Sequence, residues 1–532
     1  MKKGMTMIVK PSSCLFFGLF FLAACSHYRR NKSHKEVPVS SIRRGEELAK
    51  VYCQSCHLLP DPALLDAGSW EKGVLPGMGP RLGIFRHNFD LYPSSLHDTN
   101  LSKGFYPAQP LVSPEDWEHI LDYYTALSPD SLPAQQRQRQ IRDGLTLFKV
   151  EAPPIMHEAP ATCLTRVDTG GGRRGLWVYD EYYKQLYRWS ASFDRVDSLP
   201  CQGAIVDITD LTATDLLVCN IGLLGPNNGK FGKIQSIHMG LNGKAQGGHD
   251  SGIEMDSMSL AGHLARPVQL SAADLNRDGR VDILVCEFGN LTGALSWLEN
   301  MGKGRYERHV IKASPGAIRA VITDYDHDGR PDILVLFAQG DEGIFLFTNK
   351  GGGQFSERVL LRFPPMYGST YFELADLNKD GLPDILYTCG DNADLSPVLK
   401  PYHGVYIFIN KGDGQYEQAY FFPINGCYKA LARDFDGDGD PDIAAISFFA
   451  DYDRQPEEGF VFLQNRGGMD FQPYSLAETQ TGKWLTMDAA DLDGDGRIDI
   501  VLGNFSFFSP VTKKGVNFAK GPSFLLLRNQ GK

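Results

Sequence analysis

The sequence predicts a multidomain protein in which a small all-α domain precedes an all-β, seven-bladed β-propeller. A Cys-x-x-Cys-His pentapeptide lies near the amino terminus, between two segments with helical periodicity. Acid-rich segments of one pattern then recur at intervals of 50, 52, 58 and 57 residues, which suit one four-stranded blade each. At 532 residues the chain is too long for one ordinary core, so more than one domain is expected.

Composition narrows the classes of partner. A hydrophobic content of 42% and a charged content of 22% are typical of globular domains. The net charge of -11 argues against nucleic acid as a partner, because nucleic acid binding needs a basic face.

Residues 1–25 are expected to be a leader rather than part of the fold. Lysines precede the apolar stretch 15–22, which is too short to span a membrane. The sequence Leu-Ala-Ala-Cys that ends at Cys25 resembles a bacterial lipobox, which implies a lipidated Cys25 at the mature amino terminus. A plain secretory signal peptide is the alternative. Ser26 favours the outer membrane over the inner one, and the polar residues 26–40 are expected to form a tether.

The pentapeptide Cys53–His57 predicts covalent attachment of haem. Two thiols at this spacing can add to the two vinyl groups, and His57 can bind the iron. A redox dithiol or a chance Cys-x-x-Cys is the alternative. The preceding segment 43–52 reads as a short helix, with Gly45 and Leu48 along it, and resembles the opening helix of small c-type cytochromes.

A second helix is predicted within 113–129. Ser113 is its expected cap, with Pro114 in the first turn, and Trp117, Ile120 and Tyr124 fall on one face. It resembles the last helix of small cytochromes c. The resemblance implies a cytochrome c-like haem domain at 41–132, carrying haem c, and a linker at 133–143.

The sixth iron ligand stays open between several residues. Met78 is the only methionine between the pentapeptide and Met156, so a thioether ligand in this domain must be Met78. The stretch before the second helix, where many cytochromes c carry the axial methionine, has Tyr106 there instead. His87, His97, His119 and an open coordination position are the rivals.

The repeats predict the propeller at 144–532. Five acid-rich loops begin at Asp274, Asp324, Asp376, Asp434 and Asp491, each between two strand-like segments. Two degenerate copies, near Asp168 and Asp210, bring the count to seven. The last blade lacks an outer strand, and the segment 144–150 is expected to supply it and close the ring. The motifs resemble the FG-GAP and VCBS repeats of integrin-type propellers. That resemblance implies the fold but leaves the function open.

Each loop has the form Asp-x-Asp/Asn-x-Asp-Gly-x-x-Asp, which converges hard oxygens and suits Ca²⁺. The alternative is an acid-rich turn that binds nothing. The predicted ligands occupy positions one, three, five and nine of each loop. They are Asp274, Asn276, Asp278 and Asp282; Asp324, Asp326, Asp328 and Asp332; Asp376, Asn378, Asp380 and Asp384; Asp434, Asp436, Asp438 and Asp442; and Asp491, Asp493, Asp495 and Asp499.

Six cysteines remain once the leader, lipobox and haem cysteines are set aside. Cys219, Cys286 and Cys389 are expected to be buried strand residues at matching places in their repeats. Because an exported protein can hold disulfides, Cys163 with Cys201 is the first pairing to test.

Three classes of function are compatible with the sequence. The first is an electron carrier of the bacterial cell envelope, anchored by lipid alone, whose propeller recognises a redox partner protein or a glycan. The second is a haem-linked oxidoreductase or polysaccharide-active enzyme with its site at the mouth of the propeller. The third is a surface adhesion or binding protein. The carrier is preferred, because the sequence has no Ser–His–Asp elbow or HExxH motif and adhesion alone does not explain a haem.

One set of residues keeps the enzyme alternative open. These basic and aromatic side chains begin the strands that enter the acid-rich loops, so they are expected to gather at one mouth of the ring. There they would be either solvated charges or a site for an anionic ligand or a docking haem propionate. They are Arg266, Arg319, Tyr371, Lys429 and Lys483.

Overall fold

The computed structural model describes residues 36–154, 156–170, 174–239, 253–256, 259–393, 395–509, 511–512 and 514–531. The predicted leader, Cys25 and most of the tether lie outside these residues. In the part of the chain that is described, no helix has both the length and the apolar character needed to cross a membrane.

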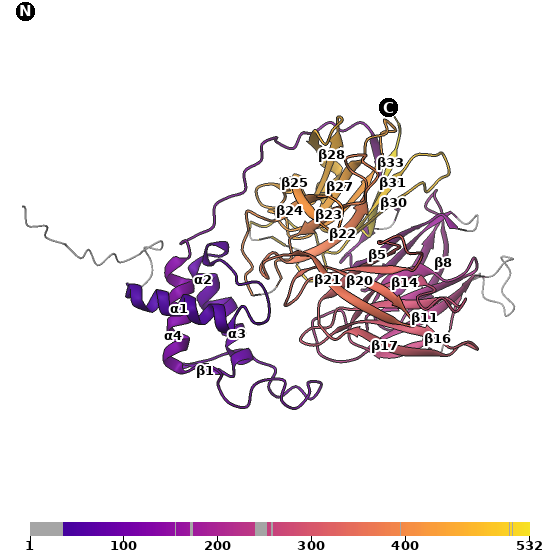
Figure 1. Ribbon diagram of the computed structural model, residues 1–532. Coiled ribbons are helices and arrows are strands. Elements are labelled where there is room, and N and C mark those ends of the chain that lie inside the picture. Colours follow the sequence, from indigo (N-terminus) through magenta and orange to yellow (C-terminus); the bar gives the residue numbers. More distant parts are fainter. Residues whose placement is uncertain are drawn as a thin grey trace, which may run out of the picture.

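Residues 36–132, here called the helical unit, form a small α-helical layer beside the propeller (Figure 1). The long helices are α1 (Val39–Tyr52) and α4 (Pro114–Leu127). Between them lie the short helical turns Pro62–Leu64, α2 (Ala67–Ser69), Trp70–Val74, α3 (Leu75–Met78) and Gly79–Leu82, and the hairpin of β1 (Arg86–His87) and β2 (Asp90–Leu91).

Helix α4 begins where the sequence predicts, because Ser113 accepts a hydrogen bond from the Asp116 amide at 3.0 Å. Helices α1 and α4 pack closely at Gly45. A Cβ at this position would lie 1.9 Å from the His119 carbonyl oxygen, so only glycine permits the contact. Trp70, Trp117 and Ile120 are buried in the core beneath it.

Seven antiparallel sheets follow, six of four strands and one of five, which confirms the predicted number of blades. In each, the first strand lies innermost, and the inner strands of neighbouring blades contact one another around the ring. Blade 1 contains β5 (Thr162–Asp168), β6 (Gly175–Asp180), β7 (Gln185–Trp189) and β8 (Arg195–Pro200). Blade 2 contains β9 (Ile205–Asp210), β10 (Asp215–Asn220), β11 (Gly232–Met239) and β12 (Ile253–Met255), with β13 (Ala261–Leu264) also paired to β11. Blade 3 contains β14 (Pro267–Ala273), β15 (Asp282–Glu287), β16 (Ala294–Asn300) and β17 (Tyr306–Lys312).

The remaining blades hold the later repeats. Blade 4 contains β18 (Ala317–Thr323), β19 (Asp332–Phe337), β20 (Gly343–Gly351) and β21 (Gln354–Arg362). Blade 5 contains β22 (Ser369–Ala375), β23 (Asp384–Cys389), β24 (Gly404–Asn410) and β25 (Tyr416–Pro423). Blade 6 contains β26 (Cys427–Arg433), β27 (Asp442–Ser447), β28 (Phe460–Asn465) and β29 (Phe471–Tyr474). Blade 7 contains β30 (Trp484–Ala490), β31 (Asp499–Asn504), β33 (Phe524–Asn529) and β3 (Phe148–Glu151), and a small sheet pairs β4 (Met156–His157) with β32 (Gly521–Pro522).

The ring closes through β3, whose Phe148 lies opposite Asn529 of β33. The paired strand starts four residues later than the expected segment 144–150. Leu145 and Leu147 precede it and are buried in the core between the last two blades. The buried side chains of Leu145 and Leu147 therefore hold this segment in place just before the residues that pair with β33.

The second strand of each blade explains the apolar runs in the repeats. In β15, β19, β23, β27 and β31 every residue is buried, because neighbouring blades cover both faces. Outer strands such as β17 and β21 are largely exposed or half-buried and carry the polar residues.

Residues 133–143, expected as a linker, form a strap along the edge of the propeller; it is the violet segment that rises from the helical unit toward the last blades in Figure 1. Gln135 donates a hydrogen bond to the His403 carbonyl at 2.8 Å, and Arg137 donates to the Pro423 carbonyl at 2.9 Å. Arg142 pairs with Tyr474 as an isolated bridge. The strap therefore fixes the path between the helical unit and the closing strand.

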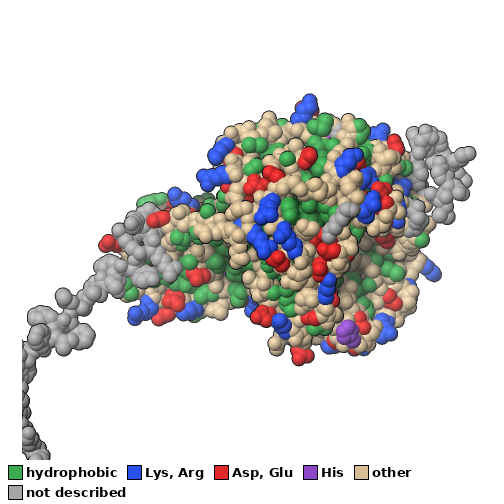
Figure 2. Space-filling view, turned by 90° about the horizontal axis from the view of Figure 1, so that it is seen from above, with side chains coloured by type: hydrophobic (Ala, Val, Ile, Leu, Met, Phe, Trp, Pro, Cys, Tyr) green, Lys and Arg blue, Asp and Glu red, His purple; other side chains and the backbone are tan. Residues whose placement is uncertain are grey.

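The helical unit contacts loops on the propeller face opposite the acid-rich loops. Tyr402 donates a hydrogen bond to the Leu64 carbonyl at 3.0 Å, and Asn228 donates to Asp98 at 2.8 Å. Met366 of the propeller is buried in the core of the helical unit. On the side seen in Figure 2, Lys and Arg side chains are interspersed with Asp and Glu.

Candidate functional sites

The Cys-x-x-Cys-His segment begins at the end of α1. The Cys53 amide donates to the Ala49 carbonyl at 2.9 Å, so this cysteine continues the last helical turn. Cys53 is half-buried and Cys56 is exposed, and both are free thiols. The two cysteines and His57 thus share one tight turn against the helical unit.

His57 has the tautomer that a metal-binding imidazole needs. Its Nδ1 lies 2.8 Å from the Leu58 carbonyl oxygen. Because a carbonyl can only accept, this contact assigns the proton of the neutral ring to Nδ1, and no partner of Nε2 is found among the described residues. A hydrogen bond of this kind fixes the ring orientation and the nitrogen that faces a metal.

Cys53 does not resemble a redox-active thiol. Burial raises the pKa of the Cys53 thiol to about 11. Reactive dithiols instead have lowered pKa values. Burial and the nearby Cys53 thiol also raise the pKa of Tyr124, whose buried hydroxyl faces that thiol.

The candidates for the sixth ligand differ in their exposure and in the partners that their side chains have. Met78 ends α3 and is half-buried. His87 Nε2 lies 2.9 Å from Glu118, and His119 Nδ1 lies 2.6 Å from the Ser41 hydroxyl. His97 is exposed. His87 and His119 would have to give up these partners to bind iron. Met78 remains the predicted sixth ligand.

Each acid-rich loop joins the first and second strands of blades 3 to 7. Its first aspartate accepts a hydrogen bond from the amide of the glycine at position six, for example Gly279 to Asp274 at 2.9 Å. That glycine has a φ of +84°, and nothing lies within 4 Å of the place for a Cβ. The left-handed backbone, rather than lack of space, therefore requires glycine here.

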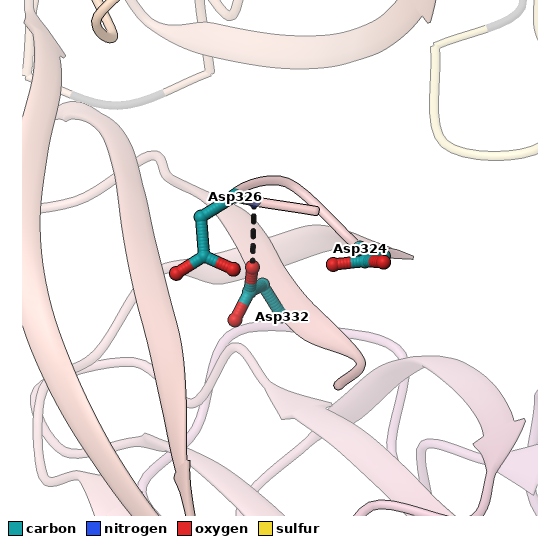
Figure 3. Close-up of side chains that lie close together, drawn as sticks. All are labelled: Asp324, Asp326 and Asp332. Carbon is teal, nitrogen blue, oxygen red and sulfur yellow. Dashed lines mark hydrogen bonds between the residues drawn. The ribbon is translucent and has the colours of Figure 1, made fainter. Parts of the chain in front are cut away.

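Three loops bring acidic oxygens together. Ligand atoms of Asp324, Asp326 and Asp332 lie within 4.8 Å of one another (Figure 3), and the Asp326 amide donates to Asp332 at 3.4 Å. The same separation holds for the groups Asp434, Asp436, Asp438 and Asp491, Asp493, Asp495. Hence each of these loops brings together three of the four predicted ligand positions. Positions one and three are joined by position nine in blade 4 and by position five in blades 6 and 7.

An oxygen without a partner supports a cation in the loop of blade 4. Asp324 Oδ1 is buried and accepts no hydrogen bond within the described part of the chain. In the loops of blades 3 and 5 the third position is an amide. Asn276 and Asn378 donate to Asp278 and Asp380 at 3.2 and 2.8 Å.

Sequence reasoning missed a structural role for the aspartate at position nine. Asp282 Oδ1 accepts from the Asn300 amide at 2.8 Å and Oδ2 from the Leu275 amide at 3.0 Å, so it joins the loop to the third strand. The Asn300 Oδ1 in turn accepts a hydrogen bond from the Gly302 amide at 2.9 Å. The signal was available as an Asn-x-Gly after each third strand, at Asn300, Asn349, Asn410, Asn465 and Asn529.

The basic and aromatic set expected at one mouth divides into two. Arg319, Tyr371 and Lys429 meet in the channel. Arg266 donates to the Gly289 carbonyl at 2.6 Å in a loop between strands, and Lys483 lies 4.9 Å from the Phe448 ring and donates to the Ser509 carbonyl. The expectation of one cluster of five is wrong, because Arg266 and Lys483 each lie three residues before the channel-facing third position of the strand that follows, β14 or β30.

All six propeller cysteines are buried free thiols. The expected Cys163–Cys201 pair is therefore absent, and each thiol lies near a carbonyl two residues before it, at 3.5 and 3.6 Å. Cys219 and Cys286 occupy the fifth residue of their strands, as expected. Cys389 occupies the sixth residue and hence faces the opposite side.

The fold and the repeated loops define a seven-bladed β-propeller, a module suited to binding and recognition. A family model described as FG-GAP-like repeat matches residues 274–335, 324–387 and 434–502. Together these segments include all five acid-rich loops, so the chain carries FG-GAP-like repeats.

Solved structures of low identity are also similar to this chain. BBS1N in complex with ARL6DN, soaked with mercury, has 10% identity and a TM-score of 0.41, with 74% of this chain and 98% of that chain covered. A chain of the S. cerevisiae complex of dbp5 with nup159 and gle1 has 10% identity and a TM-score of 0.40, with 74% and 99% covered. Virginiamycin B lyase from Staphylococcus aureus has 11% identity and a TM-score of 0.41, with 71% and 98% covered.

Proposed function

We propose that this protein is an electron carrier of the bacterial cell envelope, with haem c on the helical unit and a propeller that recognises a partner. Cys53 and Cys56 would hold the haem covalently and His57 would ligate its iron. When bound, the haem supplies a one-electron couple. The observation that carries the proposal is the contact of His57 Nδ1 with the Leu58 carbonyl, which assigns the ring proton to Nδ1, in the same turn as the two free thiols of Cys53 and Cys56.

Other residues around the site suit the same group. Half-buried apolar side chains, among them Leu59, Val74 and Leu82, pack on the core beneath Cys53. The buried Tyr124 hydroxyl lies against the Cys53 thiol. Arg81 belongs to the same unit, with its guanidinium 4.6 Å from the centre of the Phe105 ring, and would supply a cation for a carboxylate-bearing macrocycle. The raised pKa of Cys53 speaks against the dithiol alternative.

Calcium is proposed as a structural ion of the acid-rich loops. The donors are carboxylate and amide oxygens, the hard ligands that Ca²⁺ prefers. Bound calcium would offset the repulsion between carboxylates such as Asp434, Asp436 and Asp438. The loops face away from the helical unit, so their proposed role is to stabilise the propeller rather than to take part in electron transfer.

The proposed location follows from the amino-terminal sequence alone. A lipid on Cys25 would anchor the protein to the membrane, and the outer membrane is the proposed one. A redox protein of the envelope, or a glycan, is the proposed ligand of the propeller. Nucleic acid is not proposed.

An enzyme active on sugars or polysaccharides is the second candidate, because Arg319, Tyr371 and Lys429 do meet in the channel. Adhesion is the third candidate and rests on the propeller alone.

Potentiometric titration of the mature protein, followed by its visible spectrum, tests the carrier proposal. A reversible one-electron transition is expected. Met78→Ala should remove a sulfur-to-iron charge-transfer band in the near infrared and lower the potential, whereas Met301→Ala on the propeller surface should change neither. A protein without any redox transition would refute the carrier proposal. A wild type without the band would refute Met78 only.

A further inference from the structure

Three of the five acid-rich loops carry an arginine directly beside their acidic ligands. It stands at position seven, as Arg280 in blade 3, Arg330 in blade 4 and Arg497 in blade 7. Each guanidinium pairs with one oxygen of the position-five aspartate of its own loop. The backbone amide of the same arginine donates to the other oxygen at 2.9 Å. One arginine therefore engages both oxygens of a predicted calcium ligand.

The same arginine side chains also reach the third strand of their blades. In each case Nε donates to the backbone carbonyl of an asparagine near the end of that strand, at 2.5 to 3.0 Å. The pairs are Arg280 with Asn300, Arg330 with Asn349, and Arg497 with Asn529. Because this contact recurs in three blades, the arginine is a regular part of these loops that holds the loop to the strand.

The loops of blades 5 and 6 have different residues at position seven, Leu382 and Asp440. Asp440 pairs with Lys379 from the loop of blade 5. Blade 6 thus has aspartate at positions one, three, five, seven and nine of its loop. Each of the other four acid-rich loops has an asparagine at position three, an arginine at position seven, or both.

The acidic group of blade 4 differs from that of blade 6 at position five. In blade 6 the oxygens that lie close together include position five, as Asp434, Asp436 and Asp438. In blade 4 the close group among the described residues does not include the position-five residue, Asp328, which is paired with Arg330. The arginine and the acidic group thus compete for one carboxylate in blade 4.

Blade 7 has two guanidinium groups on its ligand carboxylates. Asp495 belongs to the close acidic group of this loop and is paired with Arg497. Arg528 of β33 lies 2.5 Å from Asp493, another member of the group. Blade 7 therefore has as many aspartates at the predicted ligand positions as blade 6, but they are partly neutralised by the protein itself.

A guanidinium on a ligand carboxylate opposes calcium for two reasons. Its positive charge repels the ion at short range. It also occupies an oxygen that the ion would otherwise coordinate. Calcium affinity depends on the number of charged ligands and on how freely they can converge. On both counts the loop of blade 6 is the one best suited to bind the ion tightly.

We propose that the position-seven arginines set the calcium affinity of their loops, and that the loop of blade 6 is the tightest calcium site of the propeller. Arg280, Arg330 and Arg497 are internal competitors of the ion, which hold their loops to the third strand when calcium is scarce. The inference rests on the calcium role proposed above and adds an order of filling, in which residues 434–442 bind calcium first.

Calorimetric titration of the calcium-depleted, full mature protein with calcium chloride tests this order. The wild type should show one tight site and a weaker class. Asp440→Arg should weaken the tight site, and Arg330→Gln should convert one weak site into a second tight site. Each change is expected to be about threefold to tenfold, because the arginine side chains are 34 to 45% exposed and solvent screens their charge.

Arg362→Gln is the matched control. It makes the same substitution in blade 4, at an exposed arginine that pairs with Asp341 at the other end of the blade. Its calcium titration should equal that of the wild type.

Hydrogen exchange at increasing calcium concentration assigns the sites to loops. In the wild type, protection should appear first at residues 434–442. In Arg330→Gln, residues 324–332 should become protected at the same low calcium concentration. An arginine that serves only to hold the loop would not move this concentration downward.

The outcomes separate this inference from the calcium role itself. Folded wild type that binds no calcium would refute both. Calcium binding that is equally tight in wild type, Arg330→Gln and Asp440→Arg would overturn only the role of the arginines, as would protection that appears first in another loop. Circular dichroism checks that the variants are folded. If Arg330→Gln fails to fold, Arg497→Gln, expected to strengthen the site of blade 7, decides the question with the same readouts.

Discussion

Glu342 shows how one buried carboxyl can make stability depend on pH. Its side chain is almost fully buried, and Oε2 accepts from the Ser369 amide at 3.0 Å and the Ser369 hydroxyl at 2.7 Å. Burial raises the pKa of Glu342 to about 8. The folded state therefore holds this proton more tightly than the unfolded state, whose glutamate pKa is about 4.3.

Glu342→Gln should remove part of the pH dependence. The contribution of protonated Glu342 to stability is fully present below about pH 4.3 and is lost as the pH rises through about 8. Gln keeps the shape without the charge, so the variant should gain stability over the wild type at and above pH 8. Denaturant midpoints measured across this range check the result. Glu417→Gln, at an exposed position, is the control, and parallel curves for Glu342→Gln and wild type would contradict the account.

Gly45 is a second residue on which an element depends. Gly45→Ala should lower the free energy of unfolding by about 1–3 kcal/mol, because its Cβ would meet the His119 carbonyl and force α1 and α4 apart. Gly68→Ala, where the nearest atom is a flexible Asp66 oxygen at 3.2 Å, is the matched control. Thermal unfolding of both variants gives the comparison. Equal stability of the two would show that α1 and α4 do not cross closely at Gly45.

At the scale of elements, bound calcium should stabilise the acid-rich loops. Chelation should lower the unfolding temperature of the propeller, because an ion that binds only the folded state stabilises it by mass action. Asp326→Asn should reduce the calcium content by one site. Metal analysis and melting curves with and without chelator check both expectations. Melting that is unaffected by chelator, with no calcium in the protein, would leave the loops as hydrogen-bonded turns.

The strap is an element held by a buried ion pair. Arg137 pairs with Glu458, and the side chains are 5% and 0% exposed. Arg137→Ala should destabilise the protein by about 3–5 kcal/mol, because Glu458 would keep a buried charge without a cation. Arg137→Ala with Glu458→Gln should recover much of the loss, whereas Arg139→Ala, at a half-exposed pair, should have a small effect. Denaturant unfolding measures all three, and no recovery in the double variant would contradict this explanation.

The sequence was informative about elements for identifiable reasons. Loops that begin at Asp274, Asp324 and their later counterparts recur at the length of one blade, so the number of blades follows from counting. Burial on both faces makes the second strands apolar throughout, which is why they are visible as runs. The closing strand was placed a few residues early, because Leu145 and Leu147 are apolar yet serve as side-chain anchors before the paired strand.

The parts that escaped prediction depend on contacts between distant residues of a repeat and on strand register. The pairing of Asp282 with Asn300 crosses from the loop to the third strand, and no local pattern states that the two meet. Similarly, Lys483 has the same charge as Lys429 but precedes β30, three residues before the channel-facing position, so it contacts Phe448 instead of entering the channel. The register of each strand determines which charged side chains reach the channel, and the pattern of charges in the sequence does not reveal that register.

For the whole molecule, the arrangement separates the proposed roles. The helical unit packs on the face opposite the acid-rich loops, through Tyr402 and Asn228, and the strap fixes its connection to the last blade. An electron centre at Cys53 would thus lie on the side of the propeller whose loops differ most in length from blade to blade. The calcium loops would lie on the other side, where they stabilise the ring.

Covalent haem content is the most direct measurement of the central claim. Mature protein produced in a bacterial envelope that matures c-type cytochromes is denatured, separated on a gel and stained for haem, with intact mass as a second readout. The account predicts one haem that survives denaturation, is lost in Cys53→Ala with Cys56→Ala, and is retained in Cys427→Ala, which removes a buried propeller thiol. Protein without covalent haem, or haem retained in the double variant, would contradict it.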